Sequence, residues 1–517
     1  MSGADHSADQ LLRDIRATLM PGFVGTTLPA WLERRLTDGL GGVAIFGGNV
    51  ESLPQLRALT DAVRAARPEA VIAIDEEGGD VTRLFYAEGS PYPGNAVLGR
   101  IDDLDYTAEV AARVGRTLRS VGCTLTMAPD VDVNSNPHNP VIGVRSFGAD
   151  TGLAARHSAA WVRGVQSTGI AACPKHFPGH GDTAQDSHLA LPIVDASPEL
   201  LVARDLPPFS AAIDAGALCI MTSHILLPQI DPHGPATFST SILQGLLRGQ
   251  LGFAGVIVSD ALDMRGASGE IGIPAAAVRA LTAGCDLLCI GTENTDDELA
   301  EIEAAVLRAV SSDRLPAVRV HEAAARVRAL SSALPAPVDE LPAAGLAEAE
   351  SSTAASSDFP GEDEVQRVLA SFDGVPEAHA WLAAHPRATI VRVDTEANIA
   401  VGVAPWGPFA AALRPADSAK AQASAADFLA RRLVTVDAET PIPWECDASA
   451  VMVLGRDLHR HEFARDGIDA LREHGVSVFT IDTGWPGHDR GYAGLATYGA
   501  SRLVGAALLS LVQEDPR

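Results

Sequence analysis

The chain has 517 residues, of which 47% are hydrophobic and 5% aromatic, and its formal net charge is −27. This length is too great for one compact core and indicates two domains. The composition excludes a disordered or fibrous chain. The acidic charge disfavours nucleic acid and anionic lipid as partners, because the long-range field repels polyanions. A neutral small molecule is therefore the expected partner.

No part of the sequence has the character of a targeting or membrane segment. Residues 1–21 hold no apolar run long enough for a signal peptide, and no stretch reaches the roughly 18 uncharged apolar residues that span a bilayer. We therefore expect a cytoplasmic protein without membrane contact. The six cysteines lie mostly in apolar runs and lack metal-ligand spacing, so we expect reduced core residues.

Short apolar runs alternate with longer helical patterns from about residue 18 to residue 330. Nearly every run ends in Gly, Pro, Asp or Ser, which is typical of βα units. The expected strands cover residues 18–23, 42–46, 71–75, 124–128, 169–173, 218–222, 255–259 and 286–290. Eight parallel strands predict an α/β fold whose first domain, residues 1–335, is a (β/α)8 barrel.

A second domain is expected after a linker. The last barrel helix is predicted at residues 321–334, and the prolines and small acidic residues of 336–360 indicate a linker. Further buried strands are predicted at residues 389–393, 433–436, 450–454 and 476–481, interleaved with helices such as 462–473. Residues 361–517 are therefore expected to form a smaller α/β sandwich domain.

Polar residues follow the carboxyl ends of the expected barrel strands, where barrels of this kind build active sites. They are Asp75, Asp130, Asp132, Lys175, His176, His224 and Asp260, with Arg83 and Arg145 in the loops beyond. A single Asp at such a position is often only a helix N-cap. A whole set of them indicates a functional site at this rim.

The densest segment is the loop of residues 175–188, KHFPGHGDTAQDSH. Its Pro and Gly exclude a regular helix, so His176 and His180 do not share a helical face and no metal site is expected. Asp186 and His188 are two residues apart, and in an extended loop their side chains point to the same side. The carboxylate can then orient and charge-stabilise the imidazole. An incidental surface pair is the alternative interpretation.

Asp260 closes the apolar run 255–259, where a strand opens into a loop. A carboxylate there can attack an anomeric carbon or balance the positive charge of an oxocarbenium-like transition state. Asp263 competes for this role. Its place at the expected start of the next helix favours capping instead.

Together these segments resemble glycoside hydrolase family 3, in particular its bacterial β-N-acetylglucosaminidase branch. The resemblance covers residues of about 20 to 330. It is carried by DEEGG at 75–79 with Arg83, APDVDVN at 128–134, RSFG at 145–148, the 175–188 loop and SDALDM at 259–264. The long loop is the most specific of these pieces.

The resemblance implies a retaining enzyme without a cofactor. Asp260 would be the nucleophile, and Asp186 with His188 would form the acid/base dyad. The residues implied to hold the hydroxyls of the terminal sugar are Asp75, Arg83, Arg145, Lys175 and His176. These residue types suit a neutral polyol, since carboxylates accept hydrogen bonds and cationic groups donate them.

The acceptor and the sugar stay open. After donating its proton a histidine is neutral, so it admits a phosphate dianion that a glutamate anion would repel. Asp80, where many relatives of this branch carry a basic residue, departs from the family pattern. Phosphorolysis, with inorganic phosphate as co-substrate and a sugar α-1-phosphate as product, is therefore slightly favoured over hydrolysis. Glucose and N-acetylglucosamine are both credible, and an inactive sugar-binding protein is a remote alternative.

Overall fold

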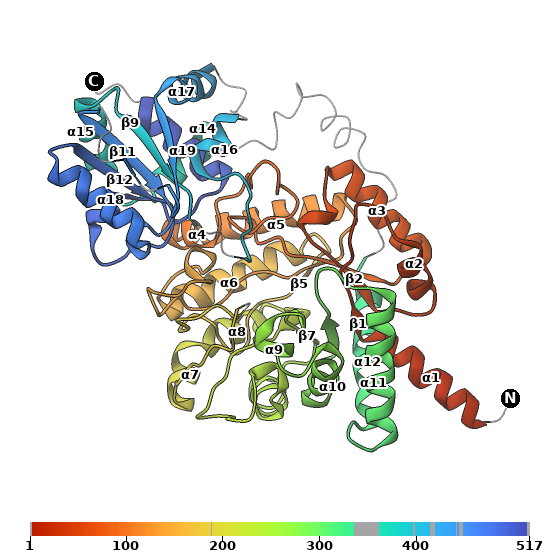
Figure 1. Ribbon diagram of the computed structural model, residues 1–517. Helices are drawn as coiled ribbons and strands as arrows, with labels where there is room; N and C mark the ends of the chain where they lie inside the picture. Colours follow the sequence, from red (N-terminus) through yellow and green to blue (C-terminus); the bar gives the residue numbers. More distant parts are fainter. Residues whose placement is uncertain are drawn as a thin grey trace. The chain divides into compact units, whose positions relative to one another are not determined.

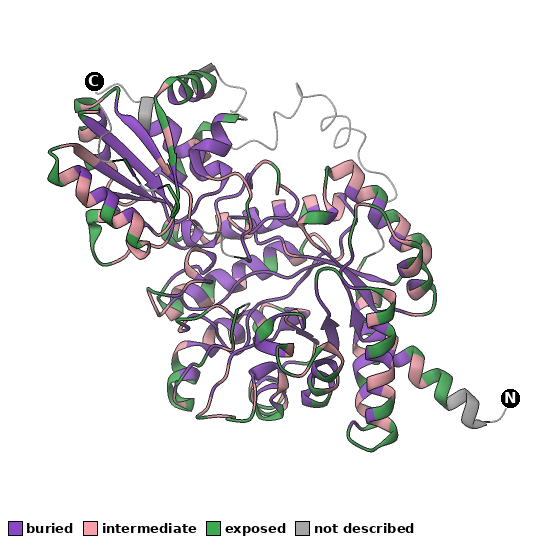
Figure 2. Ribbon diagram, viewed as in Figure 1, coloured by how far each residue is buried: buried purple, intermediate pink, exposed green. Residues whose placement is uncertain are grey.

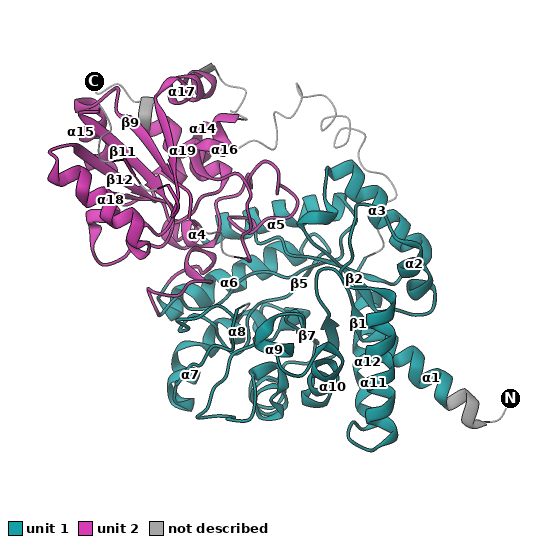
Figure 3. Ribbon diagram, in the orientation of Figure 1, with its two compact units in different colours: residues 1–77, 104–135, 149–350 teal, residues 78–103, 136–148, 351–517 magenta. Residues whose placement is uncertain are grey.

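The computed structural model describes residues 3–187, 189–335, 361–395, 399–413, 419–440, 442–443 and 448–513. His188, the expected linker 336–360 and Cys446 lie outside the described residues. The chain divides into two compact units (Figure 3). Unit 1 comprises residues 1–77, 104–135 and 149–350, and unit 2 comprises residues 78–103, 136–148 and 351–517. The predicted domain boundaries at 335 and 361 stay a prediction.

Unit 1 contains the eight predicted barrel strands, each shorter than predicted. They are β1 (Leu19–Met20), β2 (Gly42–Ile45), β3 (Val71–Ile74), β4 (Leu125–Thr126), β5 (Ala171–Ala172), β6 (Cys219–Met221), β7 (Val256–Ser259) and β8 (Leu287–Cys289). The strands form two four-stranded sheets, in the orders β2-β3-β4-β5 and β1-β8-β7-β6. All neighbouring pairs within these sheets are parallel.

Backbone hydrogen bonds join the two sheets of unit 1 into a closed ring. At one seam the Ala44 N–H donates to the Pro21 carbonyl at 2.9 Å. At the other seam the Met221 N–H donates to the Pro174 carbonyl at 2.9 Å, and the Phe177 N–H donates to the Met221 carbonyl at 2.8 Å. The predicted (β/α)8 barrel is therefore confirmed, and the carboxyl ends of its strands share one rim.

Helices surround the barrel strands (Figure 1). They are α1 (Gly3–Ala17), α2 (Ala30–Thr37), α3 (Leu53–Ala66), α5 (Leu104–Ser120), α6 (Thr151–Gln166), α7 (Pro198–Arg204), α8 (Leu206–Asp214), α9 (Arg265–Ser268), α10 (Ile273–Ala283), α11 (Asp296–Ser311) and α12 (Ala317–Ala333), with shorter turns η1 (Gly47–Asn49) and η3 (Ala236–Phe238) and the π-helix η4 (Ser241–Gln250). Side-chain caps start several of them. The Thr295 hydroxyl, for example, accepts the Glu298 N–H at 3.3 Å, and acidic residues fill the first turn of α11.

Buried side chains of alternate strand residues fill the barrel, whose strands are buried throughout (Figure 2). On β3, Val71 and Ala73 belong to the interior cluster, whereas Ile72 and Ile74 face the surrounding helices. Cys123, Cys173, Cys219, Cys285 and Cys289 are buried and reduced, as predicted. Among the described helices, none combines the length and apolar character needed to cross a lipid bilayer.

Unit 2 is built on a five-stranded parallel sheet. Its strands are β9 (Thr389–Val393), β10 (Leu433–Val436), β11 (Ala450–Gly455), β12 (Ser477–Asp482) and β13 (Leu495–Ala496), in the order β10-β9-β11-β12-β13. From β9 the chain passes to β10 on one side of β9, and it then crosses to β11 on the other side. The topological switch point therefore lies between β9 and β11. Four of the five strands were predicted within two residues.

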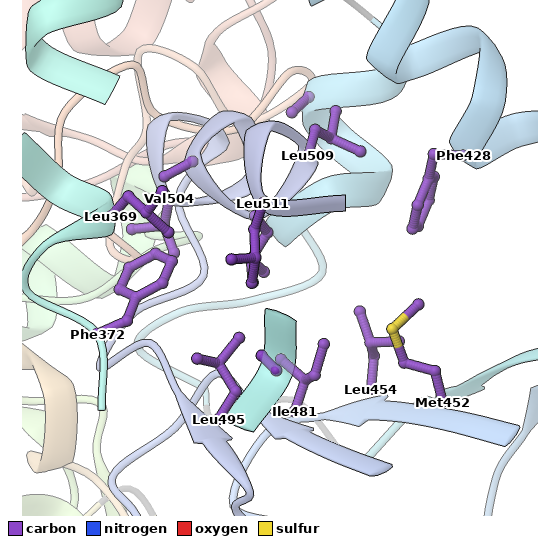
Figure 4. Close-up of a cluster of buried hydrophobic side chains, with 14 of the residues drawn as sticks. Leu369, Phe372, Phe428, Met452, Leu454, Ile481, Leu495, Val504, Leu509 and Leu511 are labelled. Atoms are coloured by element: carbon purple, nitrogen blue, oxygen red, sulfur yellow. The ribbon is translucent and has the colours of Figure 1, made fainter. Parts of the chain in front are cut away.

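Helices cover both faces of this sheet. They are α4 (Asn95–Ile101), α14 (Glu362–Leu369), α15 (Val375–Ala384), α16 (Gly407–Leu413), α17 (Ala419–Ala430), α18 (Glu462–Glu473) and α19 (Arg502–Gln513), with short turns η2 (Gly143–Arg145), η5 (Leu458–Arg460) and η6 (Arg490–Tyr492). Figure 4 shows Leu511 of α19 pointing towards the sheet that carries Leu454 and Ile481. The alternate strand residues pack on the other face against α18.

Two segments of unit 2 come from between strands of the barrel. Val97, in residues 78–103, belongs to the cluster that includes Leu503 and Leu508 of α19. The Arg100 guanidinium donates to the Ser371 carbonyl at 2.6 Å. The core of unit 2 is therefore completed by residues that precede its sheet by hundreds of positions.

Candidate active site

Three of the predicted site residues lie at the carboxyl ends of barrel strands. Asp75 directly follows β3, Asp260 directly follows β7, and Lys175 lies three residues beyond β5. Because all eight strands run parallel around the ring, these positions share its carboxyl rim.

Lys175 is a buried cation held by two carboxylates. Its side chain is only 2% exposed, its Nζ atom lies 2.7 Å from Glu77 Oε1, and it also binds Asp75 Oδ1. A buried ammonium needs such partners, because removal from water is costly for an unpaired charge. Asp75 stays half-buried, whereas Glu77 is enclosed. The sequence interpretation overlooked Glu77, although it stands in the same acidic run.

His176 is oriented by a buried carboxylate. Its Nδ1 atom lies 2.7 Å from Asp132 Oδ2, and the Asp132 side chain also accepts the backbone N–H of His180 at 2.7 Å. Asp130 Oδ1 in turn accepts the Asp132 N–H at 3.0 Å. The pair fixes the ring of His176 at the rim and leaves Nε2 on its opposite side.

Asp130, Asp132 and His176 bring ligand-type atoms within 4.8 Å of one another. This set of two carboxylates and an imidazole has the composition of a metal site. In the structure, however, the His176 Nδ1 atom and the Asp132 carboxylate already bind each other. These hydrogen bonds alone explain why the three side chains lie together, without a bound metal ion.

Internal contacts shape the 175–188 loop. The His180 ring lies between Thr183 Oγ1, 2.9 Å from Nδ1, and Ser187 Oγ, 3.1 Å from Nε2. At Gly181 a Cβ atom would meet the Val133 carbonyl oxygen at 1.7 Å, so only glycine fits there. His180 is thus a structural residue of the loop.

Asp186 is half-buried at the end of this loop, where its carbonyl accepts the N–H groups of Leu189 and Ala190, each at 3.1 Å. Its predicted partner, His188, lies outside the described residues. The acid/base dyad therefore stays a prediction.

The backbone on both sides of the Asp260 peptide is held by residues that follow β6. The Asp260 N–H donates to Thr222 Oγ1 at 3.3 Å. His224 is fully buried and donates from Nε2 to the Ala261 carbonyl at 2.9 Å. Thr237 links the two supports, since its Oγ1 lies 2.8 Å from Thr222 Oγ1 and 2.9 Å from His224 Nδ1. His224 is a positioning residue for the loop that carries Asp260.

The carboxylates at the barrel rim influence the pKa of one buried thiol, that of Cys289. Burial raises the pKa of Cys289 well above its usual value, and the carboxylates of Asp263, Asp260 and Asp75 raise it further. The predicted helix-capping role of Asp263 is wrong, because the residue before α9 is Met264 and Asp263 instead accepts the Thr292 N–H at 3.0 Å. Asp263 ties two rim loops together.

The two predicted sugar-binding arginines belong to unit 2, and both are largely buried. The Arg83 guanidinium donates to the Ala400 carbonyl at 2.8 Å, and that of Arg145 donates to the Val141 carbonyl at 3.0 Å. Their contact with a sugar stays a prediction.

Asp80 carries a compensated charge. Its Oδ2 atom lies 2.9 Å from the Arg456 guanidinium, and its Oδ1 atom accepts the Ala500 N–H at 2.7 Å. The charge of Asp80 is therefore balanced by a cation of the same unit. The argument for phosphorolysis that rested on Asp80 is lost.

Comparison with known proteins agrees with this geometry. Residues 28–330 match the family model described as glycosyl hydrolase family 3 N terminal domain. The β-hexosaminidase A of Pseudoalteromonas piscicida is 36% identical over 337 residues, which are 60% of this chain and only 56% of that protein.

Solved structures resemble nearly the whole chain. A family 3 β-N-acetylglucosaminidase from Paenibacillus sp. str. FPU-7 has a TM-score of 0.78 and 28% identity, over 96% of this chain and 95% of that one. A β-glucoside phosphorylase bound to 2FGlc has a TM-score of 0.73 over 99% of this chain and 95% of that one. At 18% identity the latter likeness shows the fold alone.

Proposed function

The chain belongs to glycosyl hydrolase family 3, and on that premise we propose that it is a retaining exo-acting β-glycosidase using Asp260 as its nucleophile. Terminal β-N-acetylglucosaminides are the first choice of substrate, because the Paenibacillus relative is a β-N-acetylglucosaminidase and the Pseudoalteromonas relative a β-hexosaminidase. Terminal β-glucosides are the alternative.

The observation that carries the proposal is the position of Asp260. It is a carboxylate at the carboxyl rim of a parallel barrel. Thr222 and His224 fix the backbone around it by hydrogen bonds to the Asp260 N–H and the Ala261 carbonyl. A nucleophile has to meet the anomeric carbon in a fixed direction, so a rigid support favours the reaction. The buried pairs Lys175–Glu77 and His176–Asp132 supply neighbouring polar groups of defined orientation.

The proposed reaction has two displacements. His188 gives its proton to the glycosidic oxygen while Asp260 attacks the anomeric carbon, so the bond to the leaving group breaks and a glycosyl-Asp260 ester forms. Water then attacks the same carbon, His188 takes the proton of that water, and the ester bond breaks. Two inversions return the β configuration. Asp186 orients His188 and stabilises its charged form. No metal or cofactor takes part.

The sugar-binding groups are proposed residue by residue. Asp75 accepts hydrogen bonds from hydroxyls, while Lys175 and His176 donate. Arg83 and Arg145 are proposed as further donors.

Water is the proposed acceptor. The preference for phosphate predicted from the sequence keeps one argument, the neutral histidine, and loses the other, because Asp80 is paired with Arg456. Phosphorolysis is therefore the second candidate. It would replace water by a phosphate dianion in the second displacement and release a β-1-phosphate, because the second inversion restores the β configuration. The α-1-phosphate expected from the sequence does not fit a retaining mechanism.

One set of assays separates these possibilities. Aryl β-N-acetylglucosaminide and aryl β-glucoside are each incubated with and without millimolar phosphate, and the products are followed by proton NMR. We expect free β-sugar as the first product, at a rate independent of phosphate. A faster reaction that yields the β-1-phosphate would instead establish a phosphorylase. No cleavage under any condition would leave an inactive sugar-binding protein.

A further inference from the structure

The loop that follows β11 contacts both barrel-derived segments of unit 2. Arg456 lies one residue beyond β11, and its guanidinium pairs with Asp80 at 2.9 Å. Arg460 donates from Nη1 to the Asn139 carbonyl and from Nη2 to the His138 carbonyl, each at 2.7 Å. One short loop thus holds a residue of segment 78–103 and two residues of segment 136–148.

The contact between Arg456 and Asp80 fixes the backbone close to Arg83. Asp80 stands three residues before Arg83, and its side chain is 3% exposed. The Asp80 carboxylate is also fixed by the Ala500 N–H at 2.7 Å. Removing Arg456 would leave a buried carboxylate without its cation, so the turn before Arg83 would have to move to reach water.

The second contact leads to Arg145 through a chain of hydrogen bonds. The Asn139 carbonyl accepts from Arg460, and Asn139 Oδ1 accepts the N–H groups of Val141 at 2.9 Å and Ile142 at 2.8 Å. The Val141 carbonyl then accepts from the Arg145 guanidinium at 3.0 Å. The two terminal nitrogens of the Arg460 guanidinium each bind one of two successive carbonyls. A lysine ammonium has a single nitrogen and cannot reproduce this two-point geometry.

The loop itself is anchored in the sheet. Asp482, at the end of β12, accepts the N–H groups of Asp457 and Gly484, each at 2.8 Å. Asp457 has a φ of 51°, and its carboxylate accepts the Trp485 N–H at 2.9 Å. The base from which Arg456 and Arg460 extend is therefore rigid.

We propose that Arg456 and Arg460 are positioning residues that hold Arg83 and Arg145 in their sugar-binding conformation. The proposal rests on the proposed function. The contacts of Arg456 and Arg460 raise the fraction of molecules in which segments 78–103 and 136–148 have the conformation that binds the sugar. The apparent dissociation constant equals the intrinsic constant divided by that fraction. Weakening the contacts therefore weakens sugar binding, while a molecule that has bound still reacts at the normal rate.

The test compares Arg456→Met and Arg460→Met with the wild type. We expect KM to rise about five-fold or more, with kcat changed less than about two-fold. The inhibition constant of free N-acetylglucosamine, or of glucose if that is the substrate, should rise by the same factor, because it reports binding alone. Arg472→Met is the matched control, since Arg472 donates to a backbone carbonyl of the same unit, that of Gly491, without touching either segment.

A merely structural role predicts a different result. Loss of folded enzyme lowers the apparent kcat and leaves KM and the inhibition constant unchanged, and that pattern would overturn the proposal. Should the methionine variants not fold, Arg456→Lys and Arg460→Lys decide. They keep the charge but offer their donors from a single nitrogen, so we expect a rise in KM of about two- to three-fold for Arg460→Lys and less for Arg456→Lys. An unchanged KM in both would also overturn the proposal.

Arg83→Met and Arg145→Met separate this inference from the function on which it rests. If these variants weaken sugar binding but Arg456→Met and Arg460→Met do not, the positioning role is wrong and the sugar-binding role stands. If none of the four weakens binding, the assignment of Arg83 and Arg145 to the sugar site is itself wrong.

Discussion

The Nζ atom of Lys175 lies 2.7 Å from Oε1 of Glu77, and the same ammonium group binds the Asp75 carboxylate in the interior of unit 1. One positive charge thus stands between two negative ones. Its attraction offsets the repulsion between the carboxylates, which would otherwise be strong where water is scarce.

Lys175→Met should lower the free energy of unfolding by about 3–5 kcal/mol near neutral pH, because it removes the buried cation that both carboxylates bind. Urea unfolding at pH 7.5 measures this loss. Lys420→Met is the control. Its exposed pair with Glu362 should contribute less than about 1 kcal/mol. A loss at Lys175 no larger than that at Lys420 would contradict this account.

Asp260→Asn should reduce turnover by several orders of magnitude, because an amide cannot form the glycosyl ester. A 2-fluoro sugar substrate should leave a covalent label on Asp260 that mass spectrometry can locate. Asp263→Asn is the matched control, since an amide oxygen can still accept the Thr292 N–H. It should keep most of the activity. A label on Asp263, or no label at all, would refute the assignment.

His188→Ala should slow cleavage of substrates with poor leaving groups far more than cleavage of activated aryl glycosides, which need little protonation. Asp186→Asn should give a milder form of the same pattern. A plot of rate against leaving-group pKa is the measurement. His180→Ala removes a ring that binds Thr183 and Ser187 of the loop, and it should slow all substrates alike. Equal losses for His188→Ala would mean that another residue is the acid.

Asp457→Asn should change how stability depends on pH. Burial, with the neighbouring Asp482 carboxylate, raises the pKa of Asp457 from 3.8 to about 6. The folded protein therefore holds a proton that the unfolded chain releases, and stability falls as pH rises through this window. Asparagine keeps the acceptor for the Trp485 N–H and tolerates the left-handed backbone.

The variant should therefore be more stable than the wild type at pH 7, by about 1–2 kcal/mol, and no more stable at pH 4. Urea unfolding at a series of pH values tests this. Asp466→Asn, at an exposed position of α18, should leave the slope as it is. A slope unchanged by Asp457→Asn would assign the titration to another group.

The strands could be predicted from the sequence because each is a buried apolar run closed by a polar residue. The prediction at 255–259 matches β7 within one residue. β13 was missed, since two residues are too few for any periodic pattern. β4 and β5 are shorter than predicted, because beyond them the two segments pair through separate hydrogen bonds and an isolated bridge between Asp130 and Lys175 instead of a continuous ladder.

The rim residues Asp75, Lys175 and Asp260 could be proposed from their places after strands. Their partners could not, because periodicity does not say which side chains meet across the fold. His176 and Asp132 are 44 residues apart, and only the shared ends of β4 and β5 bring them together. The partner of Asp80 was unpredictable for the same reason, since Arg456 follows it by 376 positions in the chain.

The composition of unit 2 has a consequence for how the chain is made. Residues 78–103 leave the ribosome long before residues 368–511, yet Val97 lies in a buried cluster whose other buried members come from the later segment. A nascent barrel therefore carries an uncovered apolar helix, α4, for most of its synthesis. A variant truncated after residue 335 would leave the apolar face of α4 permanently exposed. We therefore expect it to aggregate more readily than the full-length protein.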